Sequence, residues 1–337
     1  MENYEPPFTI TNSILAHVAS ISEKLGRITL LSDMETKPHL RKNNRIKSIH
    51  SSLKIEANSL SLNQVRDVIN GKLVVGEQKE IQEVKNAYAA YEKISEINPY
   101  SIKDLKCFHG IMTKYLVEES GDFRVGQEGV FNGEQCIFMA PPAQFVPQLM
   151  EELFNWMKRS QREVHPLILS SVFHYEFVFI HPFADGNGRM ARLWHTAILS
   201  KWKPIFEYIP LESQIEKFQE DYYDAIAKCH VEGESTVFIE FMLTQIDNTL
   251  AELLNQMTDS ATDDAILDAD GANHGADHME GRLLSGLKQN PYITQTDLAK
   301  ELSLSRRTVQ RIMKELMNDG KIKRVGSTRT GHWEIND

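Results

Sequence analysis

Apolar positions three and four residues apart recur along most of the chain, which is the pattern of helices that bury one face. In the first half of the chain, the ranges that fit this pattern are Asn12–Leu31, Asn43–Asn58, Glu77–Glu96, Ser101–Val117 and Val146–Lys158. Later in the chain they are Pro166–Ile180, Met190–Trp202, Leu211–Cys229 and Phe238–Met257. The pattern therefore predicts an all-α fold for the greater part of the protein.

Two of these ranges enclose a loop of unusual composition. Pro166–Ile180 is apolar almost all round and begins with a proline, so it predicts a helix buried in the core. Met190–Trp202 has apolar residues at helical spacing and ends before Pro204, so it predicts a second core helix. The segment His181–Arg192 is therefore predicted to be a loop between two core helices.

One segment of the core breaks the helical pattern. Short runs of β-prone residues flank Asn132 and Gly133, which form the dipeptide most typical of a tight hairpin turn. Gly129–Phe138 is therefore predicted to be a small β-hairpin on the helical core.

The end of the chain has a different pattern. Three short helices are predicted there, and two strands follow around a polar turn. The helices are Gly281–Gln289, Thr294–Leu302 and Ser305–Asp319, the last with Ser305 as N-cap and Gly320 just past its end. The strands are Lys321–Arg324 and His332–Ile335. This order resembles a winged helix-turn-helix domain.

The length of 337 residues suits two domains. Thr258–Met279 holds six Asp and no Lys or Arg, which is typical of a solvated linker. We therefore expect an N-terminal helical arm over residues 1–95, a core over 96–257, an acidic flexible linker over 258–280 and a C-terminal domain over 281–337.

The net charge of −10 is unevenly spread. From Arg282 to Ile335 there are eleven Lys or Arg and five Asp or Glu, so this part carries +6 and the rest carries −16. No stretch approaches the roughly 18 apolar residues of a membrane span, and Met1–Thr11 lacks a signal-peptide pattern. The three Cys form no CxxC pair, which is typical of reduced thiols. We expect a cytoplasmic protein with no membrane partner.

The loop between the two core helices has the parts of a phosphate site. Gly186 and Gly188 allow backbone N–H groups to approach an anion at the start of a helix, and Asn187 adds a neutral donor. Arg189 and Arg192 lie three residues apart and can make forked contacts to phosphate oxygens.

Two further residues of this loop suit catalysis. Asp185 offers the carboxylate oxygen that a Mg²⁺ shared with a nucleotide takes from protein. His181 can act as a base, because its ordinary pKa lies near neutrality.

These residues resemble the signature of the Fic family, HPF-x-[DE]-GNGR-x-x-R, at every fixed position. The resemblance extends from about Asn43 to Cys229. It implies a protein adenylyltransferase that moves AMP from ATP to a Tyr, Thr or Ser hydroxyl of a target protein or of itself. It also implies that His181 deprotonates the acceptor and that Asp185 holds Mg²⁺. The same resemblance implies that the Gly186–Gly188 segment lines the α-phosphate site and that Arg189 and Arg192 bind the outer phosphates.

An upstream pair resembles the inhibitory motif of this family, [ST]-x-x-x-E-[GN]. Ser52 and Glu56 lie four residues apart near the end of the second predicted helix. The resemblance implies that the Glu56 carboxylate lies against Arg192 and displaces the γ-phosphate. Ala57 departs from the motif, which has Gly or Asn at that position.

Two more parts of the core carry expectations from the same resemblance. Val130, Phe131, Asn132 and Gly133 match the flap, a hairpin that docks an extended target chain. Gln219 and Tyr222 fall where relatives line the adenine and ribose pocket, although Gln219 departs from the Arg common there. Core packing is the alternative role for Tyr222.

The C-terminal domain predicts contacts to duplex DNA. The residues expected to make them are basic or polar positions on the third helix and beside the predicted wing: Arg306, Arg307, Gln310, Arg311, Arg324 and Arg329. A protein-docking or dimerising role is the alternative for this domain.

Two other functions stay open from the sequence. The first is a DNA-binding regulator whose core senses a nucleotide or a partner. The chain keeps His181, Asp185 and both motif arginines, and this complete set argues against a core without catalysis. The second is a Fic enzyme with other chemistry, such as removal of AMP or transfer of UMP or GMP. The phosphorylating branch has Lys in place of the second motif Gly, so Gly188 argues against it. A homodimer is also left open.

Overall fold

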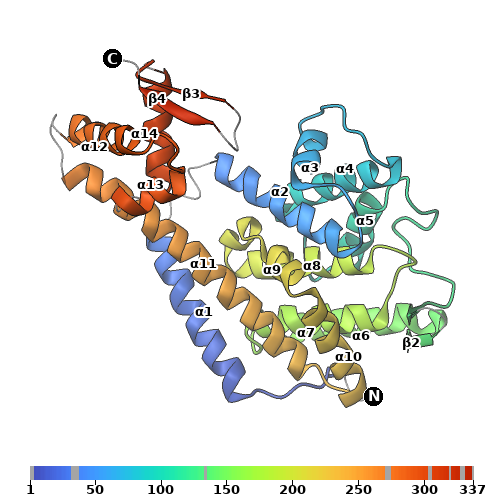
Figure 1. Ribbon diagram of the computed structural model, residues 1–337. Helices are drawn as coiled ribbons and strands as arrows, with labels where there is room; N and C mark the ends of the chain where they lie inside the picture. Colours follow the sequence, from blue (N-terminus) through green and yellow to red (C-terminus); the bar gives the residue numbers. More distant parts are fainter. Residues whose placement is uncertain are drawn as a thin grey trace. The chain divides into compact units, whose positions relative to one another are not determined.

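The computed structural model of the chain describes residues 4–31, 38–132, 135–269, 275–302, 306–318, 320–326 and 331–335. The chain divides into two compact units, Met1–Glu252 and Leu253–Asp337, and each is described by itself. Helices make up nearly all of the regular structure in the described ranges (Figure 1), which confirms the all-α prediction.

The first unit is a helical core. Its helices are α1 (Asn12–Leu31), α2 (Pro38–Ile55), α3 (Leu62–Ile69), α4 (Gln78–Glu92), α5 (Ile102–Met112), α6 (Val146–Ser160), α7 (Pro166–Ile180), α8 (Asn187–Trp202), α9 (Leu211–Lys217), α10 (Gln219–Glu232) and the first part of α11 (Thr236–Ala269). Short 3₁₀ turns lie at Ile94–Glu96, Ala143–Phe145 and Pro204–Tyr208. No helix among the described residues is both long enough and apolar enough to cross a membrane.

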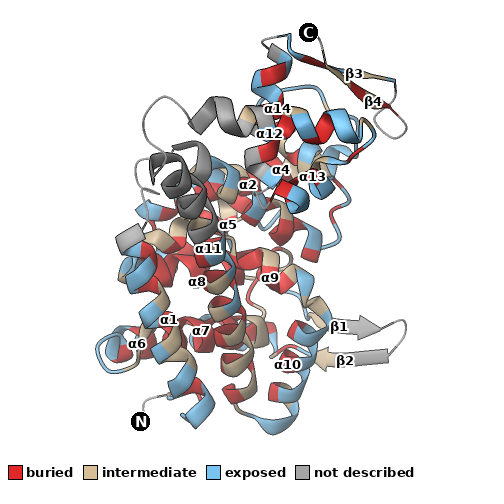
Figure 2. Cartoon of the chain, turned by 60° about the vertical axis from the view of Figure 1, so that its left-hand side comes forward, coloured by how far each residue is buried: buried red, intermediate tan, exposed pale blue. Residues whose placement is uncertain are grey.

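The packed pair α7 and α8 forms the centre of this unit, and Figure 2 shows both helices as almost wholly buried. The sequence explains this position, because α7 is apolar on every side and can be stable only when other elements surround it. Trp194 of α8 is also fully buried, and its indole N–H donates to the Pro99 carbonyl at 2.9 Å. The loop between α7 and α8 therefore rests on a closely packed base.

Several predicted boundaries of the first unit were wrong. The single helix expected over Leu211–Cys229 is two helices, because the backbone leaves the helical region at Phe218 (φ −115°, ψ 41°). The second helix begins at Pro38 and ends at Ile55. Helix α3 was not predicted, because it has only eight residues, although Ser61 and Gln64 close a capping box at its start.

The β-hairpin predicted within the core is confirmed. Strands β1 (Gly129–Asn132) and β2 (Gln135–Met139) pair antiparallel, with a register shift between Val130 and Phe131. The turn residue Gly133 lies outside the described residues.

The second unit has its own small core. It contains α12 (Gly275–Gln289), α13 (Gln295–Leu302), α14 (Arg306–Asn318) and the antiparallel strands β3 (Ile322–Val325) and β4 (His332–Ile335). Leucines of the three helices pack with Ile322 and Trp333 of the strands. Gly320 has the left-handed φ of 70° that was expected past the last helix, whereas the predicted N-cap Ser305 lies outside the described residues.

The expected linker over residues 258–280 is the main correction to the predicted organisation. Helix α11 continues to Ala269 and α12 begins at Gly275, so only residues 270–274 lie between these helices, and they are outside the described ranges. The alanines, Ile266 and Leu267 of this stretch suit a helix, and it contains no proline. Its acidic composition alone therefore gave the wrong structure.

Candidate active site

The loop that carries the motif is closed at both ends by left-handed residues. His181 ends α7 with φ 51° and ψ 60°, and Gly186 precedes α8 with φ 83° and ψ 8°. A histidine in this region is uncommon and needs support from its surroundings. Gly186 needs less support, because glycine has no Cβ to clash in this conformation.

Asn187 closes the loop from within. Its side-chain oxygen accepts from the Phe183 N–H at 2.9 Å, and its amide donates to the Phe183 carbonyl at 2.7 Å. Both polar atoms of this side chain are therefore engaged within the loop, which the sequence did not predict. The backbone N–H groups at the start of α8 are the donors that remain.

Asp185 and Arg189 form an ion pair across the first turn of α8. Oδ1 of Asp185 accepts from Arg189 Nη2 at 2.8 Å and from the Gly186 N–H at 2.6 Å. Burial alone would raise the pKa of Asp185, but the Arg189 charge and these hydrogen bonds lower it overall, so the carboxylate is ionised at neutral pH. Arg189 is buried. Its burial suits a role in holding Asp185 better than it suits the contact to an outer phosphate that the sequence predicts.

His109 supports Asp185 from α5 and was not identified from the sequence. Its Nε2–H donates to the Asp185 carbonyl at 2.9 Å, and its Nδ1 accepts from the Gly121 N–H at 2.9 Å. The ring also stacks on Phe183, with centroids 3.6 Å apart. Burial lowers the pKa of His109 to about 4, so the ring is neutral and its tautomer is set by these two bonds. No sequence motif marks this residue.

His181 lies where its ring can accept a proton. Nδ1 is 3.3 Å from the Val178 carbonyl, which can only accept, so in the neutral ring Nδ1 carries the hydrogen and Nε2 carries the lone pair. Burial lowers the pKa of His181 below its ordinary value. The imidazole is therefore neutral at physiological pH.

Arg124 holds the backbone of His181 in its uncommon conformation. Its guanidinium donates to the carbonyls of His181 and Pro141, both at 2.6 Å, and to that of Gly126 at 2.8 Å. Its own N–H also donates to the Pro182 carbonyl at 2.9 Å. One buried side chain thus ties the loop to both ends of the flap segment. The sequence analysis did not identify this role of Arg124.

The structure brings the expected inhibitory pair together. The Glu56 carboxylate accepts from Arg192 Nη2 at 2.7 Å, while the Ser52 hydroxyl and carbonyl accept from Arg192 Nε and Nη2 at 3.0 and 2.9 Å. The side chain of Arg192 is 1% exposed and that of Glu56 is 33% exposed. Burial would lower the pKa of Arg192, but Glu56 raises it overall. The guanidinium is thus inaccessible from solvent, whereas its carboxylate partner can be reached.

Gly188 makes room for this carboxylate. A Cβ at Gly188 would lie 2.2 Å from Oε1 of Glu56 and 3.1 Å from Nη1 of Arg192. The carboxylate therefore lies directly against the first turn of α8, where the helix dipole and free N–H groups attract an anion. Glu56 fills the position in which the sequence predicts a phosphate.

The turn after α2 fixes where Glu56 points. The N–H groups of Ala57 and Asn58 donate to the carbonyls of Lys54 and Leu53 at 3.0 and 3.1 Å, which is the Schellman arrangement. Ala57 has the left-handed φ of 66° that this arrangement requires. The departure from the family motif therefore places a strained alanine where glycine would be relaxed.

The two residues expected to line the nucleotide pocket behave differently. The Gln219 amide donates to the Ile55 carbonyl at 3.1 Å, so in this form it supports the last turn of α2. Tyr222 is 2% exposed within an apolar cluster, and its hydroxyl lies 2.9 Å from Nε2 of His174. The alternative of core packing thus describes Tyr222 better than contact with a nucleotide does.

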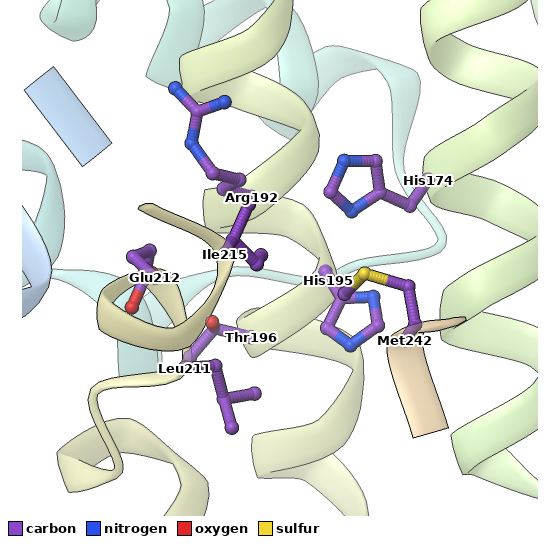
Figure 3. Close-up of a pocket in the computed structure, with 8 residues that line it drawn as sticks. All are labelled: His174, Arg192, His195, Thr196, Leu211, Glu212, Ile215 and Met242. Atoms are coloured by element: carbon purple, nitrogen blue, oxygen red, sulfur yellow. The ribbon is translucent and has the colours of Figure 1, made fainter. Parts of the chain in front are cut away.

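A small cavity lies behind Arg192 (Figure 3), lined by His174, Arg192, His195, Thr196, Leu211, Glu212, Ile215 and Met242. Burial lowers the pKa of His195 to about 4 and raises the pKa of Glu212. Both groups are therefore biased toward their neutral forms. Within the described part of the chain, no three or more His, Cys, Asp and Glu residues gather as a metal site would require.

The predicted DNA contacts lie on α14 and β3. Arg306 and Gln310 are exposed on α14, which also carries Arg307 and Arg311. The guanidinium of Arg324 stacks over the Trp333 ring, 4.8 Å from its centroid. Arg329 lies outside the described residues.

We expect Ala57→Gly to stabilise the protein by about 0.5–1 kcal/mol, because relief of the left-handed strain exceeds the extra entropy of glycine in the unfolded chain. Chemical denaturation of the variant and the parent measures the difference. Ala19→Gly is the control, since Ala19 is exposed within α1 and should lose about 1 kcal/mol. A loss of stability in both variants would contradict this account of Ala57.

Models of known families match both units of the chain. The Fic/DOC family model matches residues 99–199, and the winged helix-turn-helix DNA-binding model matches residues 277–323. The chain is 29% identical over 214 residues to the protein adenylyltransferase Fic of Culex quinquefasciatus, covering 61% of this chain and 41% of that protein. It is also 29% identical over 227 residues to the protein adenylyltransferase Fic of Nematostella vectensis, covering 62% and 49%. The chain spans less than half the length of these two relatives.

Solved structures extend the similarity to the whole chain. A Fic domain containing signaling protein from Bacteroides thetaiotaomicron has the same fold, with a TM-score of 0.61 and 19% identity over 69% of this chain and 94% of that one. A Fic family protein from Desulfovibrio desulfuricans is 39% identical, with a TM-score of 0.72, over 99% of this chain and 98% of that one. Because this likeness covers both chains almost completely, the chain belongs to the Fic family.

Proposed function

We propose that the chain is a protein adenylyltransferase, which transfers AMP from ATP to a Tyr, Thr or Ser hydroxyl of a target protein or of itself. The observation that carries this proposal is the start of α8, where Gly188 leaves room for an anion beside the buried Arg192 guanidinium. The phosphates of a nucleotide are a ligand with the charge and the acceptors that this position requires. Curated relatives named protein adenylyltransferases support the same activity.

His181 is the base in the proposed reaction. The acceptor hydroxyl gives its proton to Nε2 while its oxygen attacks the α-phosphorus of ATP. The bond from that phosphorus to the oxygen of the β-phosphate breaks, and pyrophosphate leaves. The hydrogen bond of Nδ1 to Val178 and the lowered pKa both favour the neutral ring that this step needs.

Asp185 suits the expected Mg²⁺. Its carboxylate is ionised and partly exposed, and the hydrogen bonds above use Oδ1, so Oδ2 is available as a hard oxygen ligand. When bound, the ion would neutralise charge on the phosphates. Arg189, Gly186 and His109 would hold Asp185 in place for it.

Glu56 restrains this activity in the proposed mechanism. Its carboxylate occupies the anion position beside Arg192, so a γ-phosphate must displace it or bind elsewhere. Ser52 and the turn at Ala57 keep the carboxylate within hydrogen-bond distance of Arg192. The flap would hold the target chain beside His181 by strand addition, with β1 or β2 as the edge.

We predict that His181→Ala abolishes AMP transfer and leaves ATP binding nearly unchanged. Loss of a general base typically costs about 10²- to 10⁴-fold in rate, and the ring does not contact the phosphates in the proposed reaction. Transfer of labelled AMP and nucleotide affinity are measured on the same preparation. Transfer at the parental rate would show that His181 is not the base.

We predict that Glu56→Gly increases AMP transfer by about tenfold or more, because a charge-assisted hydrogen bond that competes with ATP contributes about 1.5–3 kcal/mol. The gain should vanish on chelation of Mg²⁺ and when Arg192→Ala is added. Glu77→Gly is the control, since Glu77 is exposed and its side chain makes no capping bond to α4. Equal rates for Glu56→Gly and the parent would contradict the proposed restraint.

We propose further that the second unit binds duplex DNA. Its match to a winged helix-turn-helix DNA-binding model, the exposed Arg306 and Gln310 on α14 and the surplus of six positive charges from Arg282 to Ile335 support this role. A partner protein is the alternative ligand for the same surface.

A fragment of residues 275–337 should bind duplex DNA weakly, with an affinity that falls steeply as salt rises, because each phosphate contact releases counterions. Titration at two salt concentrations measures this slope. Arg306→Ala should weaken binding, whereas Lys288→Ala on α12 should have a smaller effect. If the fragment binds no DNA even at low salt, the unit serves a protein partner.

A further inference from the structure

A second set of contacts holds the inhibitory turn, apart from the Glu56–Arg192 pair. Asn58 is 6% exposed, and its amide donates to Glu83 Oε2 of α4 at 2.8 Å. The same amide lies 3.3 Å from the Glu80 carbonyl, and its side-chain oxygen accepts from the Leu60 N–H at 3.1 Å. The residue two positions after Glu56 is therefore anchored to α4 by a charge-assisted hydrogen bond.

The next residue strengthens this attachment. The Ser59 N–H donates to Glu80 Oε1 at 2.6 Å, and its hydroxyl donates to Glu80 Oε2 at 2.9 Å. This pair is exposed, whereas the Asn58–Glu83 contact is partly buried. We expect the buried contact to dominate, because water competes less with it.

Glu83 also faces the active loop. Its Oε1 lies 3.6 Å from Arg189 Nη1, and its side chain is 12% exposed. Nε and Nη1 of Arg189 are buried and have no hydrogen-bond partner among the described residues. One carboxylate thus lies between the inhibitory turn on one side and a motif arginine with spare donors on the other.

The two motif arginines therefore each meet a carboxylate from the N-terminal part of the chain. Arg192 meets Glu56, and Arg189 meets Glu83. Asn58 connects the two pairs, because it follows Glu56 closely in the chain and is bonded to Glu83.

We propose that Asn58 and Glu83 form a second latch on the inhibitory turn, and that Glu83 is also a positioning residue for Arg189. This inference rests on the proposed adenylyltransferase function and names the regulation of the same site. For Glu56 to leave Arg192, the turn must move and Asn58 must release Glu83. The freed carboxylate then turns fully to Arg189, whose unpartnered donors lie beside it, so it is not left as an unpaired buried charge.

The latch therefore couples release of the restraint to the support of Asp185. Arg189 holds Asp185 at 2.8 Å, and a closer Glu83 would fix Arg189 more firmly behind it. In the restrained form Glu83 is shared, and in the released form it serves Arg189 alone.

Asn58→Asp tests the latch with little change of shape. The variant keeps an oxygen for the Leu60 N–H but replaces the donating amide with a carboxylate that faces Glu83. We expect AMP transfer to rise about tenfold, which corresponds to the loss of one hydrogen bond to a charged group. Asn58→Ala removes the amide without adding charge and should also raise transfer. Asn63→Ala is the control, because Asn63 is exposed on α3 and its side chain accepts a hydrogen bond from Arg66 of the same helix. This variant should transfer AMP at the parental rate.

The latch should have no effect once the restraint is gone. Added to Glu56→Gly, Asn58→Asp should change transfer little, because the turn no longer blocks Arg192. Glu83→Gln tests the other half, since it keeps an acceptor for Asn58 and loses the charge toward Arg189. In the Glu56→Gly background it should raise KM for ATP with little change in kcat. An unchanged KM would overturn the positioning role of Glu83.

A readout without catalysis separates this inference from the proposed function. Hydrogen exchange of the amides of residues 57–60 should be faster in Asn58→Asp and Asn58→Ala than in the parent, while α8 amides stay unchanged. Unchanged hydrogen exchange in both Asn58 variants would overturn the latch. It would also be overturned if both Asn58 variants transferred AMP at the parental rate while Glu56→Gly transferred it faster. If Glu56→Gly transfers no AMP, the proposed function fails, and exchange alone then decides whether the latch exists.

Discussion

The guanidinium of Arg192 is a full charge buried at the start of a core helix, and the site depends on what neutralises it. Ser52 supplies two oxygens, and Glu56 supplies a carboxylate bonded to the guanidinium. Removing the partner of a buried ion typically costs about 3–5 kcal/mol. The position beside Arg192 is therefore expected to hold an anion in every state, and in the proposed mechanism Glu56 competes for it with a phosphate.

This competition requires that the arginine stay still while its partner can move. The loop before α8 is held by its own contacts, with Asn187 bonded to Phe183, His109 to Asp185 and Arg124 to His181. The side chains of Asn187, His109 and Arg124 are themselves buried. Glu56 instead follows the end of α2, in a turn that contains a strained alanine. The proposed restraint thus depends on the less stable of the two segments.

Burial assigns different chemical roles to the ionisable groups around the loop. His181 loses its proton more readily because desolvation disfavours the imidazolium, whereas Asp185 stays ionised because Arg189 and the Gly186 N–H outweigh desolvation. A neutral imidazole and an ionised carboxylate can therefore coexist four residues apart. Neither property follows from residue type, since both depend on which groups lie against each side chain.

Spacing and composition determined the helices α7 and α8, the loop between them and the residue types of an anion site, because apolar periodicity and glycine positions act locally. The pairing of Glu56 with Arg192 also followed from a motif resemblance. Only the tertiary structure decided that the Asn187 side chain bonds to Phe183, that Tyr222 packs in the core, and that His109, Arg124 and Glu83 contact residues of the motif. Most of these contacts join residues far apart in the chain. Separately, the acidic stretch after residue 257 is helical to Ala269, although its composition predicted a linker. Long-range packing and burial, which no local pattern records, made those choices.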